Sequence, residues 1–334
     1  MRRRSLLTLA AAAAASLRPA RAEAAQVRLS HGYGILYLPL IVMRDRKLLE
    51  TAIETAGLPR AEVTWQVVDG GNVINDAMLA GALDIAGTGA PGFITLWAKA
   101  RNIPRAEVVG LCGLSTCALS LNTNRPGIKT LADFTPADKI AIPGIKTSLA
   151  AVVLQMLVAQ KFGQAEYSRL DPMTVGLAHP EAYGALMGGK TEIAAHFASP
   201  PYSILELQDP RIHRVIAASE VLGEATLDVI YAPRRFVDAN PGITGAFLQA
   251  MDAACAAIAA DPAAAADSFI RLSAARMKPD DVLAMVRDPD TRFSATPTGI
   301  MRYAEFMHAV GSIKAAPARW ADMFVPALAG RAGS

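Results

Sequence analysis

A twelve-residue pattern occurs twice in this chain, 108 residues apart, and it limits the possible folds more than any other feature. Residues 77–88 read AMLAGALDIAGT, and residues 185–196 read ALMGGKTEIAAH. Each copy predicts a helix end, a glycine that tolerates positive φ, an acidic turn residue and a strand of small residues. Gly81 and Gly189 hold the matched glycine positions. Two such units predict two similar lobes, and a cleft between lobes is a common ligand site.

The two copies also end on polar side chains at the same position, Thr88 and His196. If the lobes face one another, these strand ends form opposite lips of one cleft, and we expect both to contact a ligand. A lone histidine is equally typical of a core, and that alternative stays open for His196. Asp84 and Glu192 precede the two strands and are predicted to be turn residues rather than catalytic carboxylates.

The first 22 residues have the pattern of a secretory signal peptide. Arginines at positions 2–4 precede an apolar stretch over residues 5–17, which is shorter than the roughly 20 residues of a membrane span. Small residues place the cleavage site near Ala22 or Ala24. The arginines are compatible with either general or twin-arginine export, and an alanine-rich helix or tail is the alternative to a signal. We therefore expect a periplasmic protein, with residues 1–22 removed.

Loss of the signal changes the charge of the chain. Five of the 33 Lys and Arg lie in residues 1–22, which hold no acid, so 28 basic and 30 acidic residues remain. A net charge of −2 without basic runs predicts no nucleic-acid partner. No later apolar run is predicted to cross a membrane.

The mature chain, roughly 310 residues, is long enough for two domains. Its three cysteines, Cys112, Cys117 and Cys255, are too few for a disulfide framework. A local disulfide between Cys112 and Cys117 is one alternative, and burial as small apolar side chains is the favoured one. Neither the cysteines nor the scattered histidines have metal-ligand spacing, so we expect no metal and no cofactor.

The pattern of the chain predicts an α/β fold with two lobes. In the first lobe, strands are predicted at residues 26–29, 62–68, 85–86 and 106–111, with helices at 42–56, 73–80 and 93–100. In the second, strands are predicted at 119–121, 139–142, 167–170, 193–194 and 213–217, with helices at 128–134, 149–162, 180–187 and 202–207. Such alternation favours open, mainly parallel sheets.

The remaining residues predict a return to the first lobe. A strand at 227–231 carries the chain back, and only helices are predicted after residue 234. Asn240-Pro241 and Asp261-Pro262 each combine an N-cap residue with proline at the first helical position. The predicted domains are therefore residues 27–118 for lobe 1, 119–226 for lobe 2, and 227–334 for the return strand and C-terminal helices.

Candidate binding residues lie in turns that follow the predicted strands. Lys146, Thr147 and Ser148 open a helix, whose free N–H groups and hydroxyl-bearing residues suit an anion or an ordinary cap. Asn72 has a similar place in lobe 1 and is also explained as a cap. The aromatic residues His31, Tyr33 and Tyr37 follow the first strand and could form either a ligand wall or core. Thr226, just before the return strand, is a further candidate.

Sequence motifs of enzymes are lacking. The chain contains no G-x-S-x-G, no phosphate-binding loop and no H-E-x-x-H. Together with export and glycine-lined turns, this favours binding over catalysis.

Several segments resemble one protein family. They are the opening strand with its aromatic loop, the Gly-x-x-Asp-Ile-Ala unit, residues 128–133 before 139–144, Pro200-Pro201-Tyr202, and residues 236–241. They are similar to the periplasmic solute-binding proteins for nitrate, sulfonate and taurine, which serve ABC importers. The resemblance implies a type II periplasmic-binding fold, in which two α/β lobes joined by a hinge close on a solute, with additional C-terminal helices.

The resemblance also implies binding loops, partners and a mechanism. The loops fall on residues 31–37, Asn72, Thr88-Gly89, residues 146–148, His196 to Ser199, and Thr226. The implied partners are a small solute (a sulfonate, an organic acid or a related heterocycle) and a membrane permease, and we expect a monomer. Two alternatives are a pyrimidine-precursor enzyme of the same fold, which export disfavours, and a ligand-sensing domain for a signalling partner.

Overall fold

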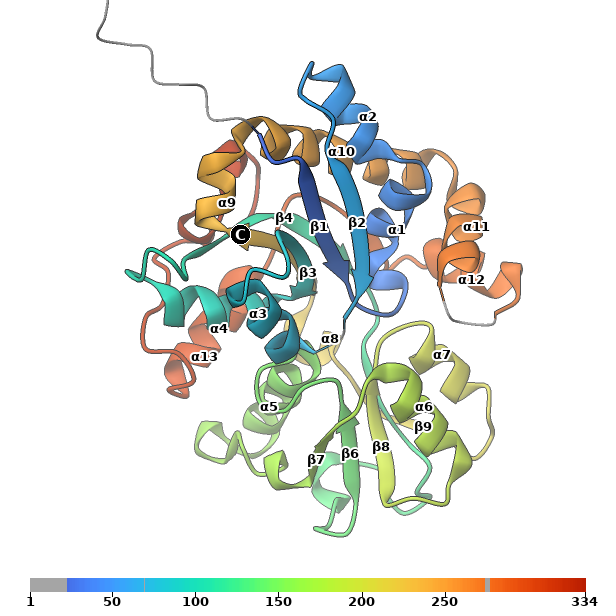
Figure 1. The fold of residues 1–334 in the computed structure, drawn as a ribbon. Coiled ribbons are helices and arrows are strands. Elements are labelled where there is room, and N and C mark those ends of the chain that lie inside the picture. Colours follow the sequence, from blue (N-terminus) through green and yellow to red (C-terminus); the bar gives the residue numbers. More distant parts are fainter. Residues whose placement is uncertain (1–22, 69, 274–276) are drawn as a thin grey trace, which may run out of the picture.

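The computed structural model describes residues 23–68, 70–273 and 277–334. The predicted signal peptide, residues 1–22, lies outside the described residues. The chain forms two α/β lobes, each built on its own sheet (Figure 1).

The sheet of lobe 1 has six strands in the order β11-β4-β10-β3-β1-β2. Its strands are β1 (Gln26–His31), β2 (Glu62–Val67), β3 (Ile85–Gly89), β4 (Val108–Thr116), β10 (Asp228–Pro233) and β11 (Arg292–Phe293). β1 runs parallel to β2 and β3, whereas β10 runs antiparallel to both of its neighbours, β3 and β4. The late strand β10 is therefore inserted into the centre of a sheet that the first part of the chain builds.

The sheet of lobe 2 has five strands in the order β7-β6-β8-β5-β9. Its strands are β5 (Ser120–Thr123), β6 (Lys139–Ile142), β7 (Thr174–Gly176), β8 (Ile193–Ala198) and β9 (His213–Ala217). β6 is parallel to β7 and β8, and β5 is antiparallel to β8 and β9. The order matches β2-β1-β3-β10-β4 of lobe 1 strand for strand, so β3 and β8, which carry the two copies of the sequence pattern, are equivalent.

Helices cover both faces of each sheet. They are α1 (Leu38–Asp45), α2 (Leu48–Thr55), α3 (Gly71–Leu79), α4 (Ala90–Ala100), α5 (Leu149–Phe162), α6 (His179–Gly188), α7 (Tyr202–Leu207), α8 (Ser219–Leu222), α9 (Arg234–Ala239), α10 (Pro241–Ala260), α11 (Pro262–Leu272), α12 (Pro279–Val286) and α13 (Ile300–Ala309). In lobe 1, α10 packs on α1 and α2, and α4 packs on α3 and α13 at the opposite face (Figure 1). α5 belongs to lobe 2 but also contacts α4 and α13, which joins the apolar cores of the two lobes.

Local sequence signals account for the ends of the main elements. Gly81 and Gly189 have φ values of +72° and +62°, as the repeated pattern predicted. The Ser148 side chain accepts a hydrogen bond from the backbone N–H of Ala151 and so caps α5. Asp261 caps α11 in the same way. The spans predicted for α5, α7, β6 and β9 agree with the structure.

Four expectations about the fold are wrong. Residues 167–170 are not a strand, because the parallel ladder beside β6 begins only at Thr174. Helices are not alone after residue 234, since β11 pairs with β4. Asn72 lies within α3, whose N-cap is Gly70, so it does not cap that helix. Asn240 precedes α10 as predicted, but its side-chain oxygen accepts from the Ala24 N–H instead of capping the helix.

The expectation that no later run could cross a membrane also needs correction. α10 is 20 residues long with a mean hydropathy of 1.5, which is enough by length and composition alone. In the structure, Phe247, Met251 and Ala254 are buried on this helix, which packs against α1 and α2. α10 is therefore a core helix of lobe 1. The three cysteines are free, in agreement with the favoured alternative.

Candidate functional site

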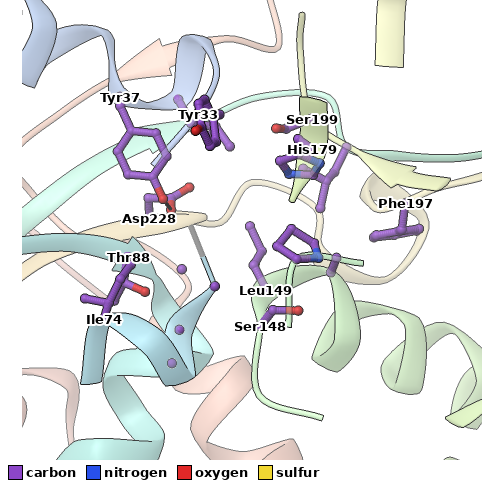
Figure 2. Close-up of a pocket in the computed structure, with 18 residues that line it drawn as sticks. Tyr33, Tyr37, Ile74, Thr88, Ser148, Leu149, His179, Phe197, Ser199 and Asp228 are labelled. Atoms are coloured by element: carbon purple, nitrogen blue, oxygen red, sulfur yellow. Dashed lines mark hydrogen bonds between the residues drawn. The ribbon is translucent and has the colours of Figure 1, made fainter. Parts of the chain in front are cut away.

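A cavity lies between the two lobes, at the carboxyl ends of the parallel strands (Figure 2). β1, β3, β6 and β8 all end here, and the antiparallel strand β10 begins here. Open α/β sheets bind ligands at this edge because the following turns and helix starts converge there. The cavity volume is about 50 Å³, which is room for only a few water molecules. Residues of both lobes line this space, and a larger solute needs the lobes to move apart.

Lobe 1 contributes a buried acid to the cavity. Asp228, the first residue of β10, is 2% exposed. The Tyr37 hydroxyl donates to its Oδ1 at 2.8 Å. Backbone pairing of β10 with β3 sets Asp228 beside Gly89, and Thr88 lies one residue further back on β3. The lobe 1 wall thus combines a carboxylate with a hydroxyl and the ring of Tyr33.

Lobe 2 contributes hydroxyls, a histidine and apolar side chains. Ser148 and Leu149 come from the start of α5, and Phe197 and Ser199 from the end of β8 (Figure 2). Ser199 is 1% exposed, and no atom in the described part of the chain forms a hydrogen bond with its hydroxyl. A buried hydroxyl in this state costs free energy unless a ligand or water pairs with it. Ser199 is therefore a candidate ligand contact.

Behind the lobe 2 wall, a buried chain of hydrogen bonds supports His179, the first residue of α6. Its Nδ1 lies 2.8 Å from Nε2 of His196, and Nδ1 of His196 lies 2.5 Å from Glu206 Oε1. Asn122 Nδ2 donates to the other Glu206 oxygen at 2.9 Å. The His179 ring stacks on Tyr202, with ring centroids 5.8 Å apart. His196 and Glu206 are fully buried, and His179 lines the cavity.

The hydrogen-bond chain restricts the protons on both rings. Since the Glu206 carboxylate only accepts, Nδ1 of His196 donates to it. Nε2 of His196 is then the acceptor for a hydrogen bond from Nδ1 of His179. Burial, and then the proximity of His196, lower the pKa of His179 well below its ordinary value, so this ring is neutral at pH 7.

Six of the predicted site residues line the cavity together. They are Tyr33, Tyr37, Thr88, Gly89, Ser148 and Ser199. Two more, Asn72 and Thr147, lie outside its lining and join the lobes: the Thr147 hydroxyl donates to Asn72 Oδ1 at 2.7 Å. A second hydrogen bond between the lobes runs from the Ile35 N–H to the Pro200 carbonyl at 3.0 Å.

Four predicted residues lie away from the cavity lining. His196 is not a lip opposite Thr88, because side chains alternate along β8 and its neighbour Phe197 faces the cavity. His31 is buried behind Tyr37, with ring centroids 6.0 Å apart. Lys146 borders a separate surface hollow with Asp171. Thr226 accepts from the Thr298 N–H where the chain returns to lobe 1.

The sequence reasoning missed Asp228, His179 and Glu206. Asp228 lies two residues after the predicted Thr226, so its position at the start of the return strand was the available signal. His179 precedes a proline at the start of a predicted helix, which placed it near a turn. Nothing local distinguishes Glu206, because its role depends on contact with β5 and β8.

Charge is distributed unevenly around this cavity. Among the described residues that line it, the ionisable side chains are Tyr33, Tyr37, His179 and Asp228, and none is Lys or Arg. Within residues 23–68, 70–273 and 277–334, no group of three or more His, Cys, Asp or Glu side chains could hold a metal ion. The cavity therefore presents one carboxylate, neutral hydrogen-bonding groups and aromatic faces.

Comparison with solved structures identifies the class of fold. The alkanesulfonate-binding protein SsuA of Xanthomonas axonopodis pv. citri, bound to MOPS, has a TM-score of 0.70 at 18% identity, covering 87% of this chain and 95% of its own. The periplasmic nitrate-binding protein NrtA of Synechocystis PCC 6803 has a TM-score of 0.69 at 12% identity, covering 88% and 83%. A Candida albicans gene product described as having the generic periplasmic binding protein fold has a TM-score of 0.65 at 13% identity, covering 87% and 92%.

These likenesses confirm the predicted fold. The chain has the two-lobed type II fold of the periplasmic binding proteins. No protein-family model and no curated protein sequence matches the chain. The chemistry of the cavity, rather than the sequence of a relative, must therefore indicate what it binds.

Proposed function

We propose that this chain is the solute-binding component of an ABC importer, of the nitrate, sulfonate and taurine type. The observation that carries the proposal is the cavity between the lobes, to which both lobes contribute polar side chains at the carboxyl ends of their strands. The likeness in fold to SsuA and NrtA supports it. The predicted signal peptide fits export to the periplasm, where the protein would act as a monomer.

The proposed mechanism is capture by closure of the lobes. In the open form, a solute contacts one lobe, and contacts from the second lobe then favour the closed form. The Asn72–Thr147 and Ile35–Pro200 hydrogen bonds belong to the closed form, because each joins residues of different lobes. We place the hinge at the two chain crossings, residues 117–119 and 223–227. A membrane permease would then receive the closed, loaded protein, and no catalytic step is required.

The test combines ligand binding with a measure of lobe closure. The purified protein is screened by thermal shift against small sulfonates, carboxylates, amines and heterocycles, and hits are measured by calorimetry. Small-angle scattering of the free and loaded protein then reports compaction. We expect at least one solute to raise the melting temperature and to compact the protein. If no solute stabilises the protein while one is chemically consumed, the binding-protein proposal fails in favour of an enzyme.

A further inference from the structure

We propose that the bound solute presents nitrogen hydrogen-bond donors, as in an amine or an amino-substituted heterocycle, rather than a sulfonate, nitrate or carboxylate group. This inference rests on the proposed function and specifies its substrate class. It follows from the charge, the hydrogen-bonding capacity and the aromatic faces of the cavity.

The first argument is charge. Asp228 is 2% exposed and lines the cavity, and its Oδ1 accepts a hydrogen bond from the Tyr37 hydroxyl. No Lys or Arg is among the lining residues that the structure describes. An oxyanion in the same space would meet a carboxylate of like charge in a low-dielectric environment, which is strongly unfavourable. A cationic or N–H-bearing group would instead complement Asp228.

The second argument is the state of the facing histidine. Among the lining residues within the described part of the chain, His179 is the one whose side chain could supply a positive charge to an oxyanion. Its pKa is lowered by burial and by His196, so protonation near neutral pH is disfavoured. Lobe 2 therefore offers the uncharged ring of His179 and the hydroxyl of Ser199, and this hydroxyl can pair with an N–H group.

The third argument concerns the walls. Tyr33 and Tyr37 on lobe 1 supply two aromatic rings at the cavity (Figure 2), and Phe197 of lobe 2 is also among the lining residues. Aromatic faces attract cations and stack on flat heterocycles. Sulfonate and nitrate gain little from such faces, because their polar oxygens need donors.

Helix N-termini provide the main counter-argument. α3, α4, α5 and α6 begin beside the cavity, and helix starts favour anions. However, each N-terminus carries only about half a charge, and some of their donors are already used. The N–H of Ala151 bonds to Ser148, and the N–H of Ala90 bonds to the Leu227 carbonyl. The carboxylate of Asp228 lines the same cavity as these helix starts.

The experiment uses matched ligands that differ in the polar group. Propylamine is compared with propanesulfonate, and an aminopyrimidine with a pyrimidinecarboxylate, by calorimetry on the wild-type protein and on variants. We expect the amino member of at least one pair to bind at least tenfold more tightly than its oxyanion partner. Asp228→Asn should weaken the amino ligand by about tenfold to a hundredfold, because a buried charge partner is lost, and should not weaken the oxyanion.

Two further variants distinguish the site from general effects. Tyr37→Phe keeps the carboxylate and removes one hydrogen bond, so it should reduce affinity less than Asp228→Asn. Asp76→Asn makes the same charge change at an exposed position of α3 and should leave affinity unchanged. Thermal unfolding verifies that each variant is folded.

The outcomes test the substrate class separately from the binding-protein function. Preferential binding of an oxyanion, unaffected or improved by Asp228→Asn, overturns the substrate class and leaves the binding-protein function intact. An amino ligand whose affinity is equal in wild type and Asp228→Asn also overturns it. If no solute of either kind binds or compacts the protein, both the substrate class and the proposed function are rejected.

Discussion

At the scale of single residues, the buried hydrogen bonds that join Glu206, His196 and His179 restrict which side chains these positions can hold. Glu206 and His196 are fully buried, so each polar atom depends on its protein partner. Glu206 accepts from His196 on one oxygen and from Asn122 on the other. A carboxylate meets both needs, whereas an amide offers one acceptor and one donor.

The first prediction follows from that geometry. In Glu206→Gln, the amide NH2 faces either the Asn122 NH2, which opposes two donors, or Nδ1 of His196, which can accept only if both histidine rings change tautomer. We expect a loss of about 1–3 kcal/mol in the free energy of unfolding, measured by urea denaturation at neutral pH. Glu181→Gln, at an exposed position of α6, is the matched control. A loss no larger than that of the control would show that the chain of hydrogen bonds does not contribute to stability.

A second residue-scale prediction concerns pH. Burial lowers the pKa of His31 and of His179 below the ordinary value of 6.5. In the unfolded chain both rings bind a proton near pH 6.5, whereas the folded protein resists protonation until a lower pH. The unfolded state therefore binds more protons below pH 6.5. The contribution of these two rings to the free energy of unfolding should be fully present above pH 6.5. It should decrease as the pH falls below that value, by up to about 1.4 kcal/mol per pH unit for each histidine.

Urea denaturation between about pH 7 and about pH 5 measures this dependence. The proximity of His196 lowers the pKa of His179 further, and the charge of Arg44 lowers the pKa of His31 further. His31→Leu should make the pH dependence shallower than in wild type, and His308→Gln, at an exposed position, should not. Equal slopes in wild type and His31→Leu would contradict the assignment.

The sequence pattern led to residues of the cavity lining near the ends of parallel strands and at a helix start. Thr88 lies near the end of β3, Ser199 follows β8, and Ser148 precedes α5. His196 was misplaced because the repeat aligned it with Thr88, whereas its neighbour on β8, Phe197, is the one that faces the cavity. A shift of one residue moves a side chain to the opposite face of a sheet. The sequence pattern does not determine which of two neighbouring residues faces the cavity.

At the scale of elements, most helices were predictable and the insertion of β10 was only partly so. Capping residues and apolar patterns determine α5, with Ser148 at its start and Gly163 at its end. The sequence also indicated a return strand near residues 227–231. It could not show that this strand enters between β3 and β4, because pairing depends on tertiary contacts. Asp228 was missed for the same reason.

The contact between α3 and the turn before α5 gives a third prediction. Thr147 donates to Asn72 across the two lobes at an exposed position. Thr147→Val keeps the shape and removes the donor, so the closed form loses a hydrogen bond worth roughly 0.5–1.5 kcal/mol. We expect solute affinity to decrease by about two- to tenfold, mainly through faster dissociation, in calorimetry and stopped-flow measurements.

The control for that change is Thr51→Val on α2, an exposed threonine outside the cavity lining. It should leave both affinity and dissociation rate unaltered. If Thr147→Val behaves like this control, the Asn72–Thr147 bond does not stabilise the closed form.

At the scale of the whole molecule, the repeated sequence pattern corresponds to a repeated sheet. β3 and β8 hold equivalent positions in two sheets of the same strand order, and the chain passes between lobes twice. The sequence could predict two lobes and a cleft, because the copies and the crossings are local signals. It could not predict how closely the lobes approach, which depends on side-chain size at their contact.

Gly89 is one of the glycines that permit a close approach of the two lobes. It ends β3 in lobe 1, and a Cβ at this position would lie 2.8 Å from the Cβ of Leu149 in lobe 2. Its φ of −54° and ψ of 136° are accessible to any residue. Alanine at this position would therefore not strain lobe 1, but it would hold the lobes apart by steric contact.

The last prediction is that Gly89→Ala folds normally and fails to close. Because closure supplies the contacts from the second lobe, we expect solute affinity to fall at least about tenfold. The radius of gyration of the protein with saturating solute should stay near that of the open form. Gly127→Ala, where an added Cβ meets nothing within 4 Å, should close as wild type does. If solute compacts Gly89→Ala fully, Leu149 moves aside, and closure of the lobes does not require a glycine at position 89.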